Sequence, residues 1–124
     1  MEFTATVIDH FVNPRNMGEI KDPSYVAQAE DNTCGDKLSL YVKIEGDRIT
    51  DAKFKALGCG AFVATSSMVT EMIKGKTLDE AKQLTSADII DALGGLPEEK
   101  SHCAALLKEV VDKVVVDYGG KNHG

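Results

Sequence analysis

The chain has 124 residues, of which 43% are hydrophobic and 27% are charged, as is typical of a single soluble globular domain. Its net charge of −6 and its pI of about 5.0 argue against a chain-wide basic surface for nucleic acid or anionic membranes. No window approaches the roughly 20 apolar residues of a membrane span, and the N-terminus lacks the layout of a signal peptide. We therefore expect a cytoplasmic protein that binds neither nucleic acid nor membrane.

The first half of the chain predicts a helix followed by strands. In chain order, the pattern predicts a helix over residues 2–12, a weak strand over 25–27, and an antiparallel hairpin of strands over 38–44 and 49–56. Pro14 ends the helix, because the residue before a proline is pushed out of the helical region. The second hairpin strand breaks its alternation near Thr50, which predicts an irregularity there.

The second half of the chain is predicted to be helical. Its pattern indicates helices over residues 61–74, from Thr77, from Ser86, and over 101–117. Thr77 and Glu80 have the spacing of a capping box. We find neither repeats nor a second domain, and we expect residues 2–118 to form one α+β domain followed by a flexible tail over 119–124.

The three cysteines each lie at a joint between predicted elements. Cys34 precedes the first clear strand, Cys59 lies between Gly58 and Gly60, and Cys103 is in the first turn of the last helix. A helix N-terminus favours thiolate over thiol, which we expect for Cys59 and Cys103. In a reducing compartment, an odd cysteine count indicates metal or redox chemistry rather than a disulfide framework.

The kind of metal is left open by the cysteines alone. Soft thiolates select zinc, copper(I) or iron–sulfur clusters. The close C-x2-C pairs of structural zinc sites are absent from the sequence, so the spacing does not choose among these metals. For any single cysteine, a buried small apolar residue is the alternative.

Three polar neighbours could complete a metal site. His102 precedes Cys103 and is either a ligand or proton carrier, or an exposed residue at a helix start. Asp36 lies two residues after Cys34 and is either a weak ligand or base, or a carboxylate that caps a turn. Lys100 lies three residues before Cys103 and either stabilises a thiolate or is solvated. The residues alone do not decide between these alternatives.

Several segments of the chain occur together in one known family. They are, in chain order, Val7-Ile8-Asp9-His10-Phe11, Asn13-Pro14-Arg15-Asn16, Cys34-Gly35-Asp36, Gly58-Cys59-Gly60 with Ser66-Ser67, Gly75-Lys76-Thr77-Leu78-Asp79-Glu80-Ala81, and Leu96-Pro97 with Lys100 and His102-Cys103. On these motifs the chain resembles the iron–sulfur cluster assembly scaffolds of the IscU/NifU N-terminal type. The resemblance implies a three-stranded antiparallel sheet packed against several helices, with the cysteines gathered at one end.

The resemblance also implies a function. Such scaffolds are not enzymes; they accept sulfur from a cysteine desulfurase, bind iron, build a [2Fe–2S] cluster and transfer it to apo iron–sulfur proteins. By position, Cys34, Cys59 and Cys103 would hold the cluster, and Cys103 would also accept sulfur as persulfide. Asp36 would keep the cluster labile, and His102 would be an alternative fourth ligand.

The same resemblance places a partner-binding segment at Leu96, Pro97 and Lys100. Members of the family carry Leu-Pro-Pro-Val-Lys there and dock Hsp70- and J-type chaperones. Glu98 and Glu99 replace the second proline and the valine, which argues against such docking here.

Two other functions use the same residues. One is a structural or regulatory zinc-binding protein, in which case zinc would be found in the purified protein. The other is a sulfurtransferase in which Cys103 carries persulfide as a catalytic nucleophile.

Overall fold

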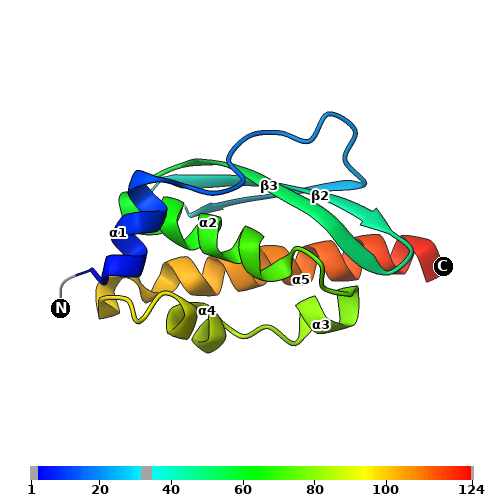
Figure 1. The fold of residues 1–124 in the computed structure, drawn as a ribbon. Helices are drawn as coiled ribbons and strands as arrows, with labels where there is room; N and C mark the ends of the chain where they lie inside the picture. The colour runs from blue at the N-terminus through cyan, green and yellow to red at the C-terminus, as the bar shows by residue number, and fades with distance from the viewer. Residues whose placement is uncertain (1–2, 32–34, 124) are drawn as a thin grey trace.

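The computed structural model describes residues 3–31 and 35–123. Its elements are, in chain order, α1 (Ala5–Val12), β1 (Tyr25–Asp31), β2 (Asp36–Glu45), β3 (Arg48–Leu57), α2 (Gly60–Ile73), α3 (Leu78–Lys82), α4 (Ser86–Ala92), the 3-10 helix η1 (Glu98–Lys100) and α5 (Ser101–His123). The strands form an antiparallel sheet in the order β1-β2-β3. One face of this sheet is covered by α2 and α5, and α3 and α4 pack on the far side of α5 (Figure 1). The expected α+β class with a three-stranded antiparallel sheet is confirmed.

The sheet packs on the helices because its apolar residues alternate. On β2, Leu38, Leu40, Val42 and Ile44 are buried, and the residues between them are half-buried. These side chains belong to one buried cluster with residues of α2 and α5, which include Phe62, Val69, Leu107 and Val110. The core therefore lies between the sheet and these two helices.

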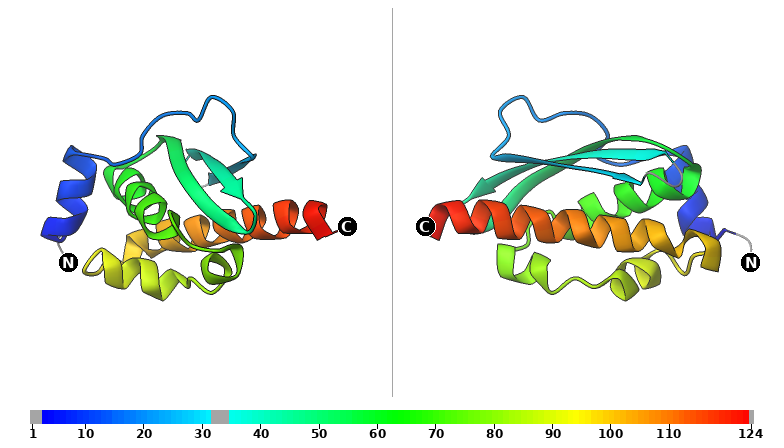
Figure 2. Two further views of the ribbon diagram at one scale, coloured as in Figure 1. Left: turned by 45° about the vertical axis from the view of Figure 1, so that its right-hand side comes forward. Right: turned by 180° about the vertical axis from the view of Figure 1, so that it is seen from behind.

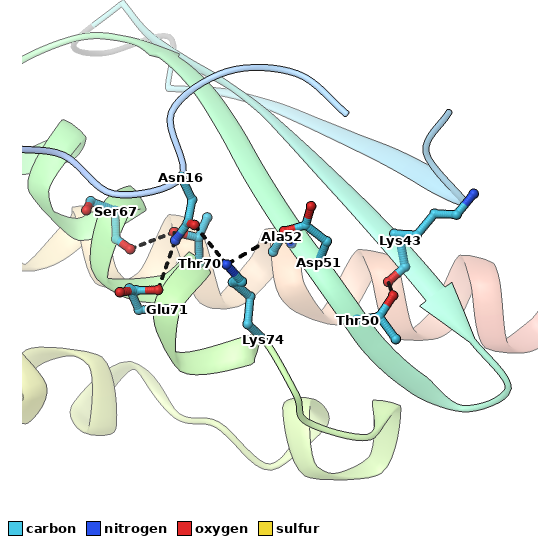
Figure 3. A network of polar contacts seen from close by, with 9 residues as sticks. All are labelled: Asn16, Lys43, Thr50, Asp51, Ala52, Ser67, Thr70, Glu71 and Lys74. Carbon is cyan, nitrogen blue, oxygen red and sulfur yellow. Dashed lines mark hydrogen bonds and ion pairs between the residues drawn. The ribbon is translucent and has the colours of Figure 1, made fainter. Parts of the chain in front are cut away.

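The hairpin of β2 and β3 contains the irregularity that the sequence predicts. Lys43 pairs with Asp51 whereas Ile44 pairs with Ile49, so Thr50 is an extra residue on β3. The Thr50 hydroxyl donates to the carbonyl oxygen of Lys43 at 3.2 Å (Figure 3). Because of this bulge, Ile49 and Ala52 are both fully buried, although strict alternation would place them on opposite faces.

The helix α1 is joined to α2 by a buried polar contact. His10 Nδ1 lies 2.8 Å from Ser67 Oγ, and the same oxygen accepts the backbone N–H of Arg15 at 2.8 Å. A neutral His10 that accepts the Ser67 hydroxyl proton on Nδ1 satisfies both contacts. Phe11 lies beside Gly60, the first residue of α2. The contacts hold α1 against the first half of α2, from Gly60 to Ser67.

The segment after α1 is fastened by Asn16, whose backbone has a left-handed φ of 60°. Its amide nitrogen donates to Thr70 Oγ1 and Glu71 Oε2, both at 3.0 Å, and its amide oxygen accepts from Lys74 Nζ at 3.0 Å (Figure 3). Its backbone carbonyl accepts the N–H of Phe54 at 2.9 Å. Asparagine tolerates this backbone region better than most residues, so one residue links α2 and β3.

The last helix is longer than the sequence predicts. The predicted end at residue 117 is wrong, because α5 continues to His123. Glycine lowers helix propensity by about 1 kcal/mol but retains its N–H, so Gly119 need not end a helix. The division into a domain over 2–118 and a flexible tail over 119–124 stays a prediction. Among the described residues, no helix combines the length and apolar character needed to cross a bilayer.

The contact between His10 and Ser67 predicts that the stability of the fold depends on pH. Burial, followed by the Arg15 guanidinium, lowers the pKa of His10 below its ordinary 6.5, although Asp9 and Glu71 oppose the shift. The stabilisation is therefore complete above about pH 6.5 and is lost as the pH falls through the lowered pKa of the folded state. We expect denaturant titrations to give a smaller free energy of unfolding at pH 5.5 than at pH 7.5.

The variant His10→Gln tests the assignment, because it removes the titrating group. It should flatten the pH dependence, whereas His102→Gln should not remove it. If the free energy of unfolding changes equally with pH in wild type and in His10→Gln, a group other than His10 causes the pH dependence.

Candidate metal centre

Three segments that are far apart in the sequence meet at one end of the molecule. Asp36 is the first residue of β2, Cys59 immediately precedes α2, and Cys103 lies in the first turn of α5. One carboxylate oxygen of Asp36 and the two sulfur atoms all lie within 4.8 Å of one another. The predicted places of Cys59 and Cys103 at element joints are confirmed, and the structure brings both thiols to one carboxylate.

Cys59 occupies the N-cap position of α2 with an extended backbone (φ −72°, ψ 167°). In the part of the chain that the structure describes, its side chain makes no capping hydrogen bond. Lys100 Nζ, on η1, lies 3.8 Å from its sulfur as a donor. Cys59 is half-buried, whereas Cys103 is fully buried, and both are free thiols. The ammonium group of Lys100 is therefore placed to offset negative charge on Cys59 or on a group bound there.

Gly58 leaves the space that the Asp36 side chain occupies. A Cβ at Gly58 would lie 2.8 Å from Asp36 Cγ and 2.9 Å from Phe62 Cδ2, and it would also collide with Asp36 Oδ1. Real Cβ atoms essentially never approach other atoms this closely. Asp36 can approach Cys59 because the residue before Cys59 has no side chain.

The carboxylate of Asp36 is nearly enclosed. Asp36 is only 3% exposed, and its Oδ2 atom has no hydrogen-bond partner among residues 3–31 and 35–123. A buried polar atom without a partner costs about 1–3 kcal/mol, so each such atom in a native structure points to an unseen water, ion or function. Beside two thiols, a carboxylate of this kind is suited to a bound cation.

Burial favours the protonated thiol of Cys103, whereas the sequence predicted a thiolate. Desolvation, followed by the neighbouring Cys59 and Asp36, raises the pKa of the Cys103 thiol to about 12, although Lys100 opposes the shift. The expectation of a thiolate favoured by the helix N-terminus is therefore wrong for Cys103. A metal ion must displace the thiol proton when it binds, so binding at this residue is coupled to proton release.

His102 lies next to this group. Its Nε2 atom is 3.9 Å from Cys103 Sγ and 3.6 Å from Asp31 Oδ2. Asp31 was not a candidate from the sequence. It is the last residue of β1 and pairs directly with Asp36 in the β1–β2 register. The sequence predicts only a weak strand over residues 25–27, which does not reach Asp31. The pairing of Asp31 with Asp36 is known only from the strand register.

Residues 2–124 match the protein-family model described as the NifU-like N terminal domain. The chain belongs to this family. It is 46% identical over 120 residues to the protein named iron-sulfur cluster assembly scaffold protein IscU 1 of Archaeoglobus fulgidus, with 97% of this chain and 78% of that protein covered. It is 44% identical over 119 residues to the IscU scaffold protein of Aquifex aeolicus, with 94% and 76% covered.

A solved structure shows the same fold at lower identity. It is a putative iron-sulfur cluster assembly scaffold protein for the SUF system from Fervidobacterium islandicum. The TM-score is 0.74 at 22% identity, and the match covers 91% of this chain and 96% of that one. The NifU-like architecture of the chain is therefore confirmed.

The structure describes the segment over residues 96–100 of this NifU-like domain but not Cys34. Cys34 lies outside the described residues, so its place among the ligands stays a prediction. Leu96 and Pro97 are buried, and Leu96 is part of the hydrophobic core, whereas Glu98 and Glu99 are exposed. The surface that η1 offers to a partner is therefore acidic rather than apolar.

The steric role of Gly58 predicts a specific effect of Gly58→Ala. The added methyl group must displace Asp36 or Phe62, so the free energy of unfolding should fall by about 1–3 kcal/mol. Anaerobic Co²⁺ binding, followed by thiolate-to-cobalt absorption, should weaken because Asp36 moves away from the thiols.

Gly119→Ala is the matched control, because a Cβ there meets no described atom within 4 Å. This change inside α5 should raise stability by about 0.5–1 kcal/mol and leave Co²⁺ binding unchanged. If Gly58→Ala is as stable as wild type and binds Co²⁺ with the same affinity, Gly58 does not position Asp36.

Proposed function

We propose that this NifU-like chain is a scaffold on which iron–sulfur clusters are assembled and from which they are transferred to other proteins. The observation that carries the proposal is the convergence of Asp36, Cys59 and Cys103 within 4.8 Å, with one Asp36 oxygen lacking a partner among the described residues. The curated relatives that match most of the chain are named as scaffolds for such assembly. The cluster is cargo rather than a resident cofactor, and the protein is not an enzyme.

The donor set suits a cluster that must leave again. Stable [2Fe–2S] and [4Fe–4S] clusters are commonly held by four thiolates. Here Cys59 and Cys103 lie beside the weaker ligands Asp36 and His102, and we propose Cys34 as the third thiolate. A [2Fe–2S] cluster on this set would be held less firmly than on four cysteines.

Sulfur would come from a cysteine desulfurase as persulfide, and the recipients would be apo iron–sulfur proteins in the cytoplasm. We propose Cys103 as the sulfur acceptor. Because Cys103 is fully buried, delivery to it requires local opening around the start of α5. The buried Leu96 and Pro97 and the exposed Glu98 and Glu99 favour a partner other than an Hsp70-type chaperone at this segment, although Lys100 remains within reach of Cys59.

Zinc binding is the second candidate function, because the same geometry favours it. Two thiols, a carboxylate and a nearby imidazole are all ligands that zinc takes in proteins. Zinc is therefore expected to compete with iron during purification. A sulfurtransferase based on Cys103 is the third candidate, and the pKa of about 12 does not separate it from the scaffold, because sulfur acceptance in either function needs Cys103 to lose its thiol proton.

Anaerobic reconstitution with Fe²⁺, a cysteine desulfurase and cysteine tests the scaffold. We expect a visible absorption band of a [2Fe–2S] cluster in wild type and its loss in Cys34→Ala, Cys59→Ala and Cys103→Ala. A sample without desulfurase controls for free sulfide. Absence of colour with one equivalent of retained zinc would favour the zinc protein, and persulfide turnover to an acceptor without iron would favour the sulfurtransferase.

Asp36→Ala is expected to slow release of the cluster, because it removes the weak ligand that keeps the cluster labile. The measurement is the rate of transfer from preloaded scaffold to an apo-ferredoxin. Asp22→Ala is the control, since the Asp22 side chain is 97% exposed and contacts only Lys43 among the ion pairs of the described chain. Equal transfer rates in wild type and Asp36→Ala would remove this role from Asp36.

A further inference from the structure

A second group of donor atoms lies beside the thiol group and contains no sulfur. One carboxylate oxygen of Asp31, one of Asp36 and a ring nitrogen of His102 lie within 4.8 Å of one another. They come from the end of β1, the start of β2 and the first turn of α5. Figure 2 shows, from behind, that β1 runs beside α5. Two carboxylates and an imidazole are a harder donor set than the neighbouring thiols.

The strand register places the two carboxylates opposite each other. Asp31 and Asp36 are direct partners in the β1–β2 ladder. Like charges in such a pair are destabilising unless something between them is positive. The first turn of α5 brings His102 to this pair, with Nε2 at 3.6 Å from Asp31 Oδ2.

An ion pair between His102 and Asp31 does not explain why the carboxylate of Asp36 is buried beside them. Their side chains are 36% and 20% exposed, so solvent can complete their contacts. Asp36 is different, because it is 97% buried and its Oδ2 atom finds no partner within the described ranges. A buried carboxylate with a partnerless oxygen, within 4.8 Å of a second carboxylate and an imidazole, points to a bound cation.

We propose that Asp31, Asp36 and His102 form a subsite for a divalent cation, Fe²⁺ in the working protein, which shares Asp36 with the thiol group. The identity of the metal as iron rests on the proposed scaffold function. Carboxylate and imidazole ligands suit Fe²⁺ and leave further positions on the ion for water. The subsite takes up the ion before sulfur is present.

The geometry also connects the two groups. His102 Nε2 lies 3.9 Å from Cys103 Sγ, and both groups use the carboxylate of Asp36. An ion held by Asp36 can exchange Asp31 and His102 for Cys59 and Cys103 without leaving the protein. Asp31 is therefore a ligand for loading, whereas the cysteines are the ligands of the cluster.

The test separates the harder ligands from the thiols. In the full chain with Cys34→Ser, Cys59→Ser and Cys103→Ser, we expect calorimetric titration with Co²⁺ to show one bound ion without thiolate-to-cobalt absorption. Adding Asp31→Asn should weaken this binding about tenfold or more, since even outer-shell partners of metal ligands contribute about 10–100-fold. Glu30→Gln is the matched control, because it removes the same charge from the adjacent, exposed position of β1. Equal Co²⁺ affinities in Asp31→Asn and Glu30→Gln overturn the subsite.

A second measurement keeps the native cysteines, in case the serine variant does not fold. X-ray absorption of the chain with one equivalent of Fe²⁺ and no sulfide should show mainly oxygen and nitrogen neighbours in wild type and Glu30→Gln. Asp31→Asn should lose the ion or shift it to sulfur neighbours. A sulfur-dominated shell in wild type, or the same shell in Asp31→Asn, overturns the proposal.

Cluster reconstitution, measured in parallel, distinguishes failure of the cation subsite from failure of the scaffold function. If wild type forms a cluster while Asp31→Asn and Glu30→Gln bind Co²⁺ equally, the subsite is wrong and the scaffold function stands. If Asp31→Asn weakens Co²⁺ binding but wild type forms no cluster, the cation subsite stands and the scaffold function is wrong.

Discussion

A carboxylate oxygen that is buried without a hydrogen-bond partner is the constraint on which this structure depends. Within the described chain, Asp36 Oδ2 is that atom, and Asp36 lies where β2 begins, with one of its carboxylate oxygens within 4.8 Å of the sulfur atoms of Cys59 and Cys103. The apo fold bears the cost of this burial, and a cation would remove it. Burial of Asp36 also strengthens its attraction for a cation, since Coulomb interactions grow as the local dielectric falls. Gly58 makes the arrangement possible because it adds no atoms where Asp36 lies.

The rest of the fold supplies a rigid frame for this end of the molecule. The bulge at Thr50 keeps the inner face of β3 apolar on both sides of the irregularity. Asn16 fastens the segment after α1 to both α2 and β3, and His10 fastens α1 to α2. Site residues at the ends of such elements are held in place by the frame.

The sequence predicted the features that depend on local pattern. Each of these features depends on only a few neighbouring residues. They are the alternation on β2, the irregularity near Thr50 and the joints that carry Cys59 and Cys103. The features that it missed depend on tertiary structure. The thiol state of Cys103 follows from burial, which outweighs the helix N-terminus, and the place of Asp31 follows from a strand register that its own weak strand signal could not define. Leu96 is a core residue for the same reason, since only packing distinguishes a buried loop from a docking loop.

The weak cluster binding proposed for this centre rests on its mixed donor types rather than on poor packing. Thiols hold soft metals strongly, but Cys103 must first lose a proton that burial retains. Carboxylates are harder donors, and they hold iron less firmly than thiolates hold a cluster. Asp36 belongs to both donor groups, so a bound ion can pass from the carboxylate and imidazole donors to the thiols while Asp36 still holds it. A centre with two overlapping sets of donors suits transfer better than storage.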